Sequence, residues 1–223
     1  MKFAVIGSGA WGTTLADLLA RNGHAVTLWT REPEVLEDIR RNRRNTLFAR
    51  DLELAPSLQA TTILDEAFSQ AEIAVFAVPS SHLRSVVKAC AGRLSAMQGL
   101  VNVAKGLEGQ SGKTLSTVFL KELQLAPNSP LDRVAVLSGP NLAGGVAAKK
   151  VGAAVMACPD EALGVALQTA FSTRYFRVYR HTDRLGVELG GTLKNIFAIG
   201  AGVVDGLGLG DNAKATYLTR SLH

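Results

Sequence analysis

A glycine-rich loop between two apolar segments at the N-terminus constrains the fold more than any other part of this chain. The loop reads Gly7-Ser-Gly-Ala-Trp-Gly12. Around it lie an apolar run of strand length, a helix-like stretch and a second apolar run, at residues 2–6, 13–22 and 25–29. Gly7 permits a tight turn, Gly9 lets the backbone approach a pyrophosphate, and Gly12 lets the helix pack on the strand. The complete βαβ unit therefore predicts a dinucleotide site at the helix N-terminus, where free N–H groups attract an anion.

The end of the second expected strand bears on the choice of cofactor. An acidic residue there would hold the ribose 2′-hydroxyl of NAD, but the chain has Thr30-Arg31. The planar guanidinium of Arg31 suits a 2′-phosphate and can stack on adenine, so NADP, or use of both NADP and NAD, is favoured. Two alternatives stay open. The first is that Arg31 is only a solvated charge in a loop. The second is that Glu32 or Glu34 holds the ribose.

Strands and helices alternate through the first 180 residues. Further strands are expected at 72–78, 99–104, 133–137, 153–157 and 175–179, and helices at 81–94 and 112–125. This alternation is typical of an α/β fold with a doubly wound, Rossmann-type parallel sheet. Near residue 181 helical spacing takes over. We therefore expect an NAD(P)-binding domain over 1–180 and the beginning of a helical substrate and dimerisation domain over 181–223.

Polar residues follow three of the expected strands. They are Pro79-Ser80-Ser81, Lys105-Gly106 and Ser138-Gly139-Pro140-Asn141. Because ligands bind at the carboxyl ends of the strands in such sheets, we expect the three segments to converge on one crevice.

Lys194 and Asn195 lie side by side in a glycine-dense helical run over residues 189–212. Desolvation in apolar surroundings would lower the pKa of a lysine, so Lys194 is a candidate general acid/base. The alternative is a lysine whose ammonium simply extends to water.

Charge and composition limit the remaining functional classes. The net charge of +5 suits anionic ligands, but the one basic run, residues 40–44, lacks interleaved aromatics, so we expect no nucleic-acid partner. The two cysteines, Cys90 and Cys158, argue against a disulfide scaffold and against a metal site. The N-terminus does not have the pattern of a signal peptide, and no apolar stretch is long enough and uninterrupted enough to span a bilayer, so a cytoplasmic location is expected.

Several of these motifs together resemble bacterial-type NAD(P)-dependent glycerol-3-phosphate dehydrogenases. The resemblance runs along the whole chain and is most specific in the segment from Gly186 to Asn195. The other matching segments are Gly7-Ser-Gly-Ala-Trp-Gly-Thr, Val78-Pro-Ser, Lys105-Gly-Leu-Glu, Leu137-Ser-Gly-Pro, Asp205-Gly-Leu-Gly and Leu218-Thr-Arg. The resemblance implies reduction of dihydroxyacetone phosphate to sn-glycerol 3-phosphate with NAD(P)H, for glycerophospholipid synthesis.

The resemblance also implies roles for individual residues. Lys194 matches the catalytic lysine of the family, Lys105 the lysine that contacts substrate and cofactor, and Asn195 the amide beside the reacting carbons. Gly139 and Asn141 match substrate positions, and Ala10, Trp11, Arg31 and Ala143 match cofactor positions. Phe48 stands where the family usually has a tyrosine in an Asn-x-x-Tyr-Leu-Pro stretch.

The family pattern continues beyond the Thr-Arg motif with an Asp, an Arg-Asn pair and a Glu that the 223 residues do not contain. We therefore expect this chain to bind cofactor and to turn over weakly or not at all. Two alternatives remain: a non-catalytic dinucleotide-binding module, and a related dehydrogenase of another keto substrate. The oligomeric state is open, with a homodimer among the options.

Overall fold

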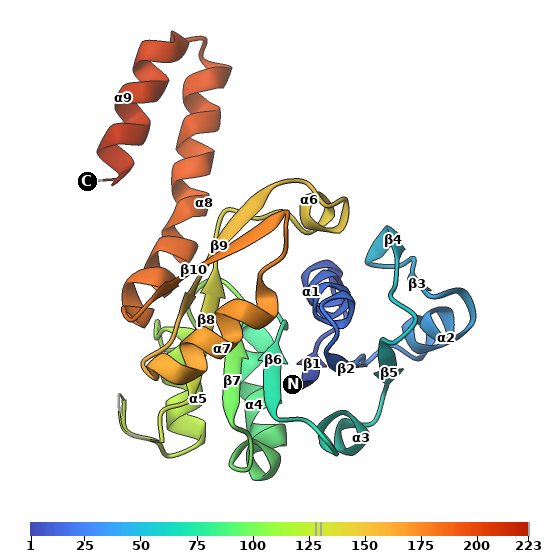
Figure 1. Cartoon of the computed structure of the whole chain (residues 1–223). Helices are drawn as coiled ribbons and strands as arrows, with labels where there is room; N and C mark the ends of the chain where they lie inside the picture. Colours follow the sequence, from blue (N-terminus) through green and yellow to red (C-terminus); the bar gives the residue numbers. More distant parts are fainter. Residues whose placement is uncertain (128, 130, 223) are drawn as a thin grey trace.

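The computed structural model describes residues 1–127, 129 and 131–222, so the last residue of the expected helical domain, 223, lies outside the described part. A single eight-stranded sheet, in the order β10-β9-β8-β7-β6-β1-β2-β5, forms its centre (Figure 1). Its strands are β1 (Lys2–Ile6), β2 (Ala25–Trp29), β5 (Gln59–Thr61), β6 (Ile73–Phe76), β7 (Gly99–Asn102), β8 (Val134–Ser138), β9 (Gly152–Ala157) and β10 (Phe176–His181). A separate hairpin consists of β3 (Arg44–Asn45) and β4 (Ala49–Glu53).

Helices cover both faces of the sheet. They are α1 (Ala10–Arg21), α2 (Pro33–Asn42), α3 (Leu64–Phe68), α4 (Ser80–Leu94), α5 (Leu115–Glu122), α6 (Ala143–Ala147) and α7 (Glu161–Phe171). Successive residues of β1 enter different cores, because side chains alternate across a strand. Phe3 and Val5 pack with α1 and α7, whereas Ala4 and Ile6 pack with α4 and α5. Burial on both faces explains the continuous apolar runs of the central strands.

The sheet departs from the expected all-parallel arrangement at one pair. β8 and β9 are antiparallel, whereas β9 and β10 are parallel to each other. The connection from β8 to β9 contains only the short helix α6, and an antiparallel neighbour needs no long crossover. The Rossmann-type, doubly wound architecture is otherwise confirmed.

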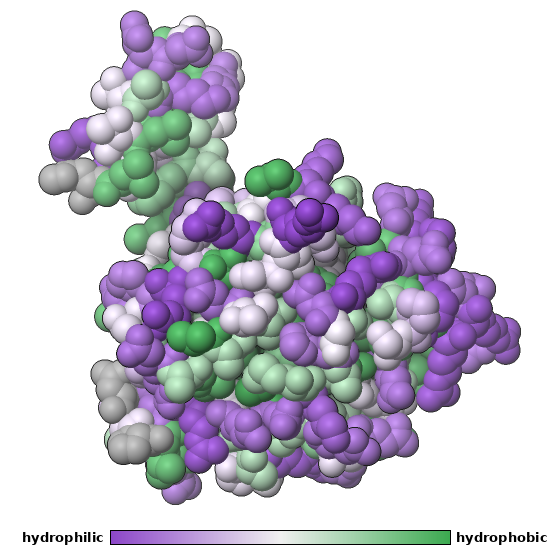
Figure 2. All heavy atoms as spheres, in the orientation of Figure 1, coloured by the Kyte–Doolittle hydropathy of each residue, from purple (hydrophilic) through white to green (hydrophobic). Residues whose placement is uncertain are grey.

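Two long helices follow the sheet. α8 (Arg184–Gly206) has Asp183 as its N-cap, and the Asp183 carboxylate accepts a hydrogen bond from the backbone N–H of Gly186 at 2.8 Å. α9 (Gly210–Leu222) folds back beside α8. Figure 1 shows this pair projecting from the sheet layer. Large apolar side chains of α8 are exposed there, including Ile199 at 70%, and Figure 2 shows apolar atoms along the projection.

α8 bears on the expectation that the chain has no membrane span. An 18-residue window of this helix reaches a mean hydropathy of 1.2, so by length and composition it could cross a bilayer. A single such helix is weak evidence for a membrane span, because core helices of soluble proteins pass the same test.

Candidate functional site

The glycine loop has the conformation that its sequence predicts. Gly7 adopts φ +111°, and a Cβ there would lie 2.7 Å from the carbonyl oxygen of Ala77. A Cβ on Gly12 would lie 2.0 Å from the carbonyl oxygen of Gly7, whereas a Cβ on Gly9 would meet nothing within 4 Å. The turn and packing roles of Gly7 and Gly12 are thus confirmed, and open space lies over Gly9.

The N-terminus of α1 fits an anionic ligand. Gly9 is its N-cap, and the first turn contains neither a capping side-chain bond nor an acidic residue among the residues described. Its first N–H groups therefore lack an intrahelical partner and carry the positive end of the helix dipole. A pyrophosphate placed over Gly9 would meet these donors.

A cleft of about 570 Å³ opens beside this loop at the carboxyl ends of β1, β2, β6 and β7. Five of the expected cofactor residues and Lys105 line it: Gly7, Gly9, Ala10, Trp11, Arg31 and Lys105. Further lining residues include Glu32, Phe48, Pro79, Ser80 and His82. Gly12 and Ala143 are not among the lining residues, since Gly12 packs against the loop and Ala143 begins α6. Size and lining thus suit an extended cofactor better than a small ligand.

One end of the cleft carries a paired guanidinium and carboxylate. Arg31 donates from Nη2 to Oε1 of Glu32 at 3.0 Å, and the Arg31 side chain is 79% exposed. The other Glu32 oxygen accepts a hydrogen bond from the hydroxyl of Thr30 at 3.2 Å. The structure therefore brings both alternatives for the ribose, Arg31 and Glu32, to the same end of the cleft. Glu34 does not line it.

Lys105 lies at the opposite end, on the loop after β7. Its ammonium nitrogen is 5.8 Å from the ring centroid of Trp11, within the range of a cation–π contact. Burial lowers the pKa of Lys105 below its ordinary value, and the positive charge of Lys194 lowers it further. The sequence alone offered no expectation that desolvation would lower the pKa of Lys105.

An ion-pair network that the sequence did not indicate holds the Lys105 loop. Arg84 of α4 binds the Glu108 carboxylate, with 2.7 Å between Nη2 and Oε2, and also pairs with Glu122 of α5. Hydrogen bonds from Arg84 and Ser111 lower the pKa of Glu108 to about 2. The Glu of the Lys-Gly-Leu-Glu motif therefore fixes the loop that presents Lys105.

Lys194 lines a second, smaller hollow of about 270 Å³. The other lining residues are Ser138, Gly139, Pro140, Val155, Val187, Gly190 and Gly191. The strand ends expected in one crevice thus line two hollows, which adjoin at Gly191. A Cβ on Gly191 would lie 2.2 Å from the Ser138 hydroxyl oxygen and 4.0 Å from Cγ of Lys105.

The two expected asparagines do not line either hollow. Asn141 donates its side-chain amide to the carbonyl oxygen of Ala153 on β9 at 2.9 Å. Asn195 is exposed, and its side-chain oxygen accepts a hydrogen bond from the ammonium of Lys194 at 3.0 Å. Asn195 therefore acts on Lys194 in this structure, and Asn141 on the backbone of β9.

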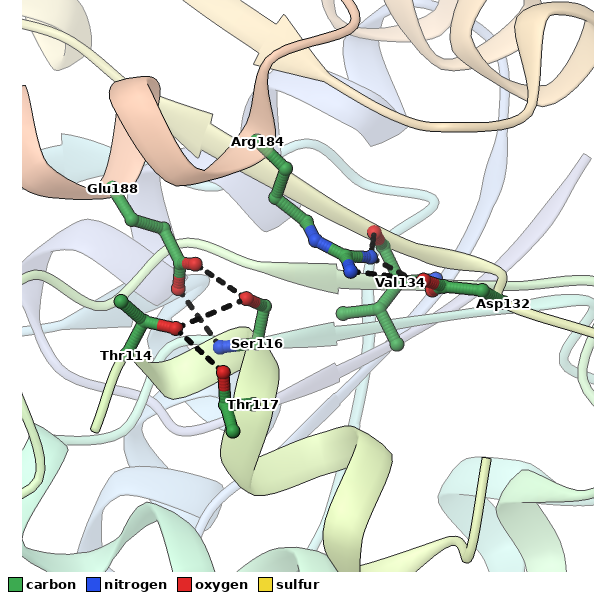
Figure 3. Close-up of polar contacts among 7 residues, drawn as sticks. All are labelled: Thr114, Ser116, Thr117, Asp132, Val134, Arg184 and Glu188. Carbon is green, nitrogen blue, oxygen red and sulfur yellow. Dashed lines mark hydrogen bonds and ion pairs between the residues drawn. The ribbon is translucent and has the colours of Figure 1, made fainter. Parts of the chain in front are cut away.

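Two buried polar contacts attach α8 to the sheet domain, and Figure 3 shows both. Glu188 accepts hydrogen bonds from the backbone N–H of Ser116, at 2.8 Å, and from the Ser116 hydroxyl. Arg184 binds both oxygens of Asp132, at 2.7 and 2.8 Å, and the carbonyl oxygen of Val134. These contacts fix the first turns of the helix that carries Lys194. Sequence reasoning missed them because their partners lie 50 to 72 residues apart.

This is the architecture of a dinucleotide-binding α/β protein of the dehydrogenase type: a glycine loop, a cleft at the carboxyl ends of the strands, and a helical region after the sheet. Comparison with known sequences places the chain more closely. Residues 2–164 match the N-terminal part of the NAD-dependent glycerol-3-phosphate dehydrogenase family, and residues 183–223 match its C-terminal part. The chain belongs to this family.

Individual relatives agree with this assignment. The chain is 45% identical over 222 residues to a glycerol-3-phosphate dehydrogenase [NAD(P)+] from Syntrophotalea carbinolica, covering 100% of the chain and 66% of that relative. It is 45% identical over 219 residues to a protein of the same description from Pseudomonas fluorescens, covering 98% of the chain and 60% of the relative. A crystal structure of glycerol-3-phosphate dehydrogenase from Coxiella burnetii superimposes with a TM-score of 0.87 at 33% identity, covering 99% of the chain and 66% of that structure. The chain thus spans somewhat less than two thirds of the length of these relatives.

Proposed function

We propose that this chain binds NAD(P)H and takes part in the interconversion of dihydroxyacetone phosphate and sn-glycerol 3-phosphate, the entry to glycerophospholipid synthesis. The observation that carries the proposal is the approach of two lysines from different elements at the junction of the two hollows. Lys194 and Gly191 line the same hollow, and a Cβ on Gly191 would lie 4.0 Å from Cγ of Lys105. In keeping with this geometry, the positive charge of Lys194 lowers the pKa of Lys105. Family membership supports the same reaction.

The residues suit this chemistry. Bound NAD(P)H supplies the hydride for the ketone carbon. Negative charge then grows on the ketone oxygen, and a cationic donor beside that oxygen both stabilises the charge and delivers a proton. We assign this role to Lys194, which Asn195 orients by its hydrogen bond. Lys105 adjoins both hollows and is suited to orient the substrate phosphate or carbonyl against the cofactor.

The same proposal covers the choice of cofactor, the division into domains, the assembly of the protein and its location in the cell. Arg31 supports use of NADPH as well as NADH, with NADPH slightly favoured, and Glu32 beside it supports retention of NADH. We assign residues 1–180 to a cofactor domain and 181–223 to the beginning of a helical substrate and dimerisation domain. A homodimer in the cytoplasm, with a small phosphate substrate and no nucleic-acid partner, completes the proposal.

The test measures NADPH oxidation on addition of dihydroxyacetone phosphate. It uses the 223-residue chain and a fusion that adds the part of the Syntrophotalea relative beyond the matched 222 residues. We expect substrate-dependent oxidation in the fusion and a loss of about 100-fold or more in kcat with Lys194→Ala, while NADPH binding stays within twofold. The proposal would be contradicted if dihydroxyacetone phosphate did not increase NADPH oxidation in either protein. It would also be contradicted if the Lys194→Ala variant kept most of its activity. Binding of NADPH without any turnover in the fusion would favour the non-catalytic module.

A further inference from the structure

Asn45 lies outside the sheet but touches the glycine loop. It is the last residue of β3, in the hairpin that follows α2, and its side chain is 0% exposed. Its amide nitrogen donates to the carbonyl oxygen of Ser8 and to the hydroxyl oxygen of Thr13, both at 2.8 Å. The Thr13 hydroxyl in turn donates to the same Ser8 carbonyl at 2.8 Å. Two donors thus hold one backbone oxygen in the middle of the loop.

The position of this oxygen decides where the next N–H group points. In a planar trans peptide the C=O and N–H groups lie on opposite sides of the chain. The Ser8 carbonyl turns toward the buried side chains of Asn45 and Thr13, so the N–H of Gly9 turns the other way. Gly9 lines the large cleft, and open space lies over it.

The other end of the same amide acts on a second wall of the cleft. The side-chain oxygen of Asn45 accepts a hydrogen bond from the backbone N–H of Phe48 at 3.2 Å. Phe48 lies in the hairpin turn, is 40% exposed and lines the cleft. One buried amide therefore connects the loop beneath the cleft with the aromatic side chain at its rim.

We propose that Asn45 is a positioning residue of the dinucleotide site, which aims the Gly9 N–H at the pyrophosphate and holds the Phe48 turn over the cleft. The inference rests on the proposed function, because it assumes a dinucleotide in the cleft. Asn45 itself touches no reacting atom. Its effect is on the preorganisation of the loop, which reduces the cost of ordering when the ligand binds.

Asn45→Asp separates the two ends of the amide. The variant keeps an oxygen for the Phe48 N–H, but it replaces the donor by a second oxygen that faces the Ser8 carbonyl. We expect affinity for ADP-ribose to fall about tenfold or more, since an unpaired or repelled buried group costs more than a lost surface contact. Affinity for adenosine, which lacks the phosphates, should change less than twofold. Both tryptophans of the chain, Trp11 and Trp29, line the cleft, so quenching of intrinsic fluorescence reports binding without a label.

Matched variants make the result decisive. Asn42→Ala removes an exposed asparagine that bonds only to Asp38 at 2.9 Å among the contacts described, and it should leave both affinities unchanged. If Asn45→Asp does not fold by circular dichroism, Thr13→Val removes one of the two donors to Ser8 and should weaken ADP-ribose binding about threefold, with adenosine unchanged. Equal losses for both ligands, or unchanged ADP-ribose affinity in a folded variant, would overturn the inference. A wild-type chain that binds neither NADPH nor ADP-ribose would instead refute the proposed function.

Discussion

The adjacent glycines of α8 offer the sharpest test of how the two hollows meet. A Cβ on Gly191 would lie 2.2 Å from the Ser138 hydroxyl oxygen, whereas a Cβ on Gly190 would meet nothing within 4 Å. Alanine stabilises a helix interior by about 1 kcal/mol relative to glycine, so Gly190→Ala should raise the free energy of unfolding by about that amount. Overpacking costs about 1 to 3 kcal/mol, so Gly191→Ala should be neutral or destabilising by up to about 2 kcal/mol after the same helix gain.

Urea denaturation followed by circular dichroism measures both variants. Ser138→Ala provides the rescue, because it removes the clashing hydroxyl and leaves the new Cβ at an ordinary 3.4 Å from the Ser138 Cβ. In that background Gly191→Ala should recover most of the helix gain. If Gly191→Ala alone stabilises the chain as much as Gly190→Ala does, α8 and the end of β8 do not pack closely, and the reasoning about the junction is wrong.

Two further predictions concern charge. Lys194→Met should raise the pKa of Lys105, measured by NMR of its side chain, but leave it below the ordinary value because desolvation is the larger cause. Because a lowered lysine pKa means that the unfolded chain binds more protons, the free energy of unfolding should rise with pH between the lowered and the ordinary pKa of Lys105. This pH interval should be narrower in Lys194→Met. An unchanged pKa of Lys105 in that variant would show that the charge of Lys194 does not act on Lys105. Arg31→Ala should weaken NADPH binding about threefold to tenfold relative to NADH in fluorescence titrations, whereas an unchanged ratio would exclude Arg31 from the 2′-phosphate.

The sequence predicted the central sheet well and its periphery poorly. β1 and β2 match their expected bounds, because burial on both faces produces continuous apolar runs. The hairpin of β3 and β4 was not predicted, since its strands are short and rich in polar residues. A buried asparagine, rather than an apolar pattern, connects that hairpin to the glycine loop.

The candidate site also contains residues that the sequence predicted and residues that it did not. The glycine loop and Lys105 were predicted, because a local motif and a strand end place them. The network of Arg84, Glu108 and Glu122 was not, since its members are polar residues far apart in the sequence. Asn141, taken from the family resemblance, lies near the expected region but binds the β9 backbone. Motifs thus locate this site, whereas side-chain direction depends on contacts that the sequence does not reveal.

The attachment of α8 to the sheet limits how far Lys194 can shift from the position that its proposed role in turnover requires. Lys194 follows Arg184 by ten residues, which at about 1.5 Å per residue is a lever of about 15 Å. A tilt of only about 4° at the Arg184–Asp132 contact would displace the backbone at Lys194 by about 1 Å, and a misplacement of that size can cost about 100-fold in rate. Any substitution that loosens this contact should therefore act on turnover far more than on cofactor affinity, although it lies a full ten residues before the lysine.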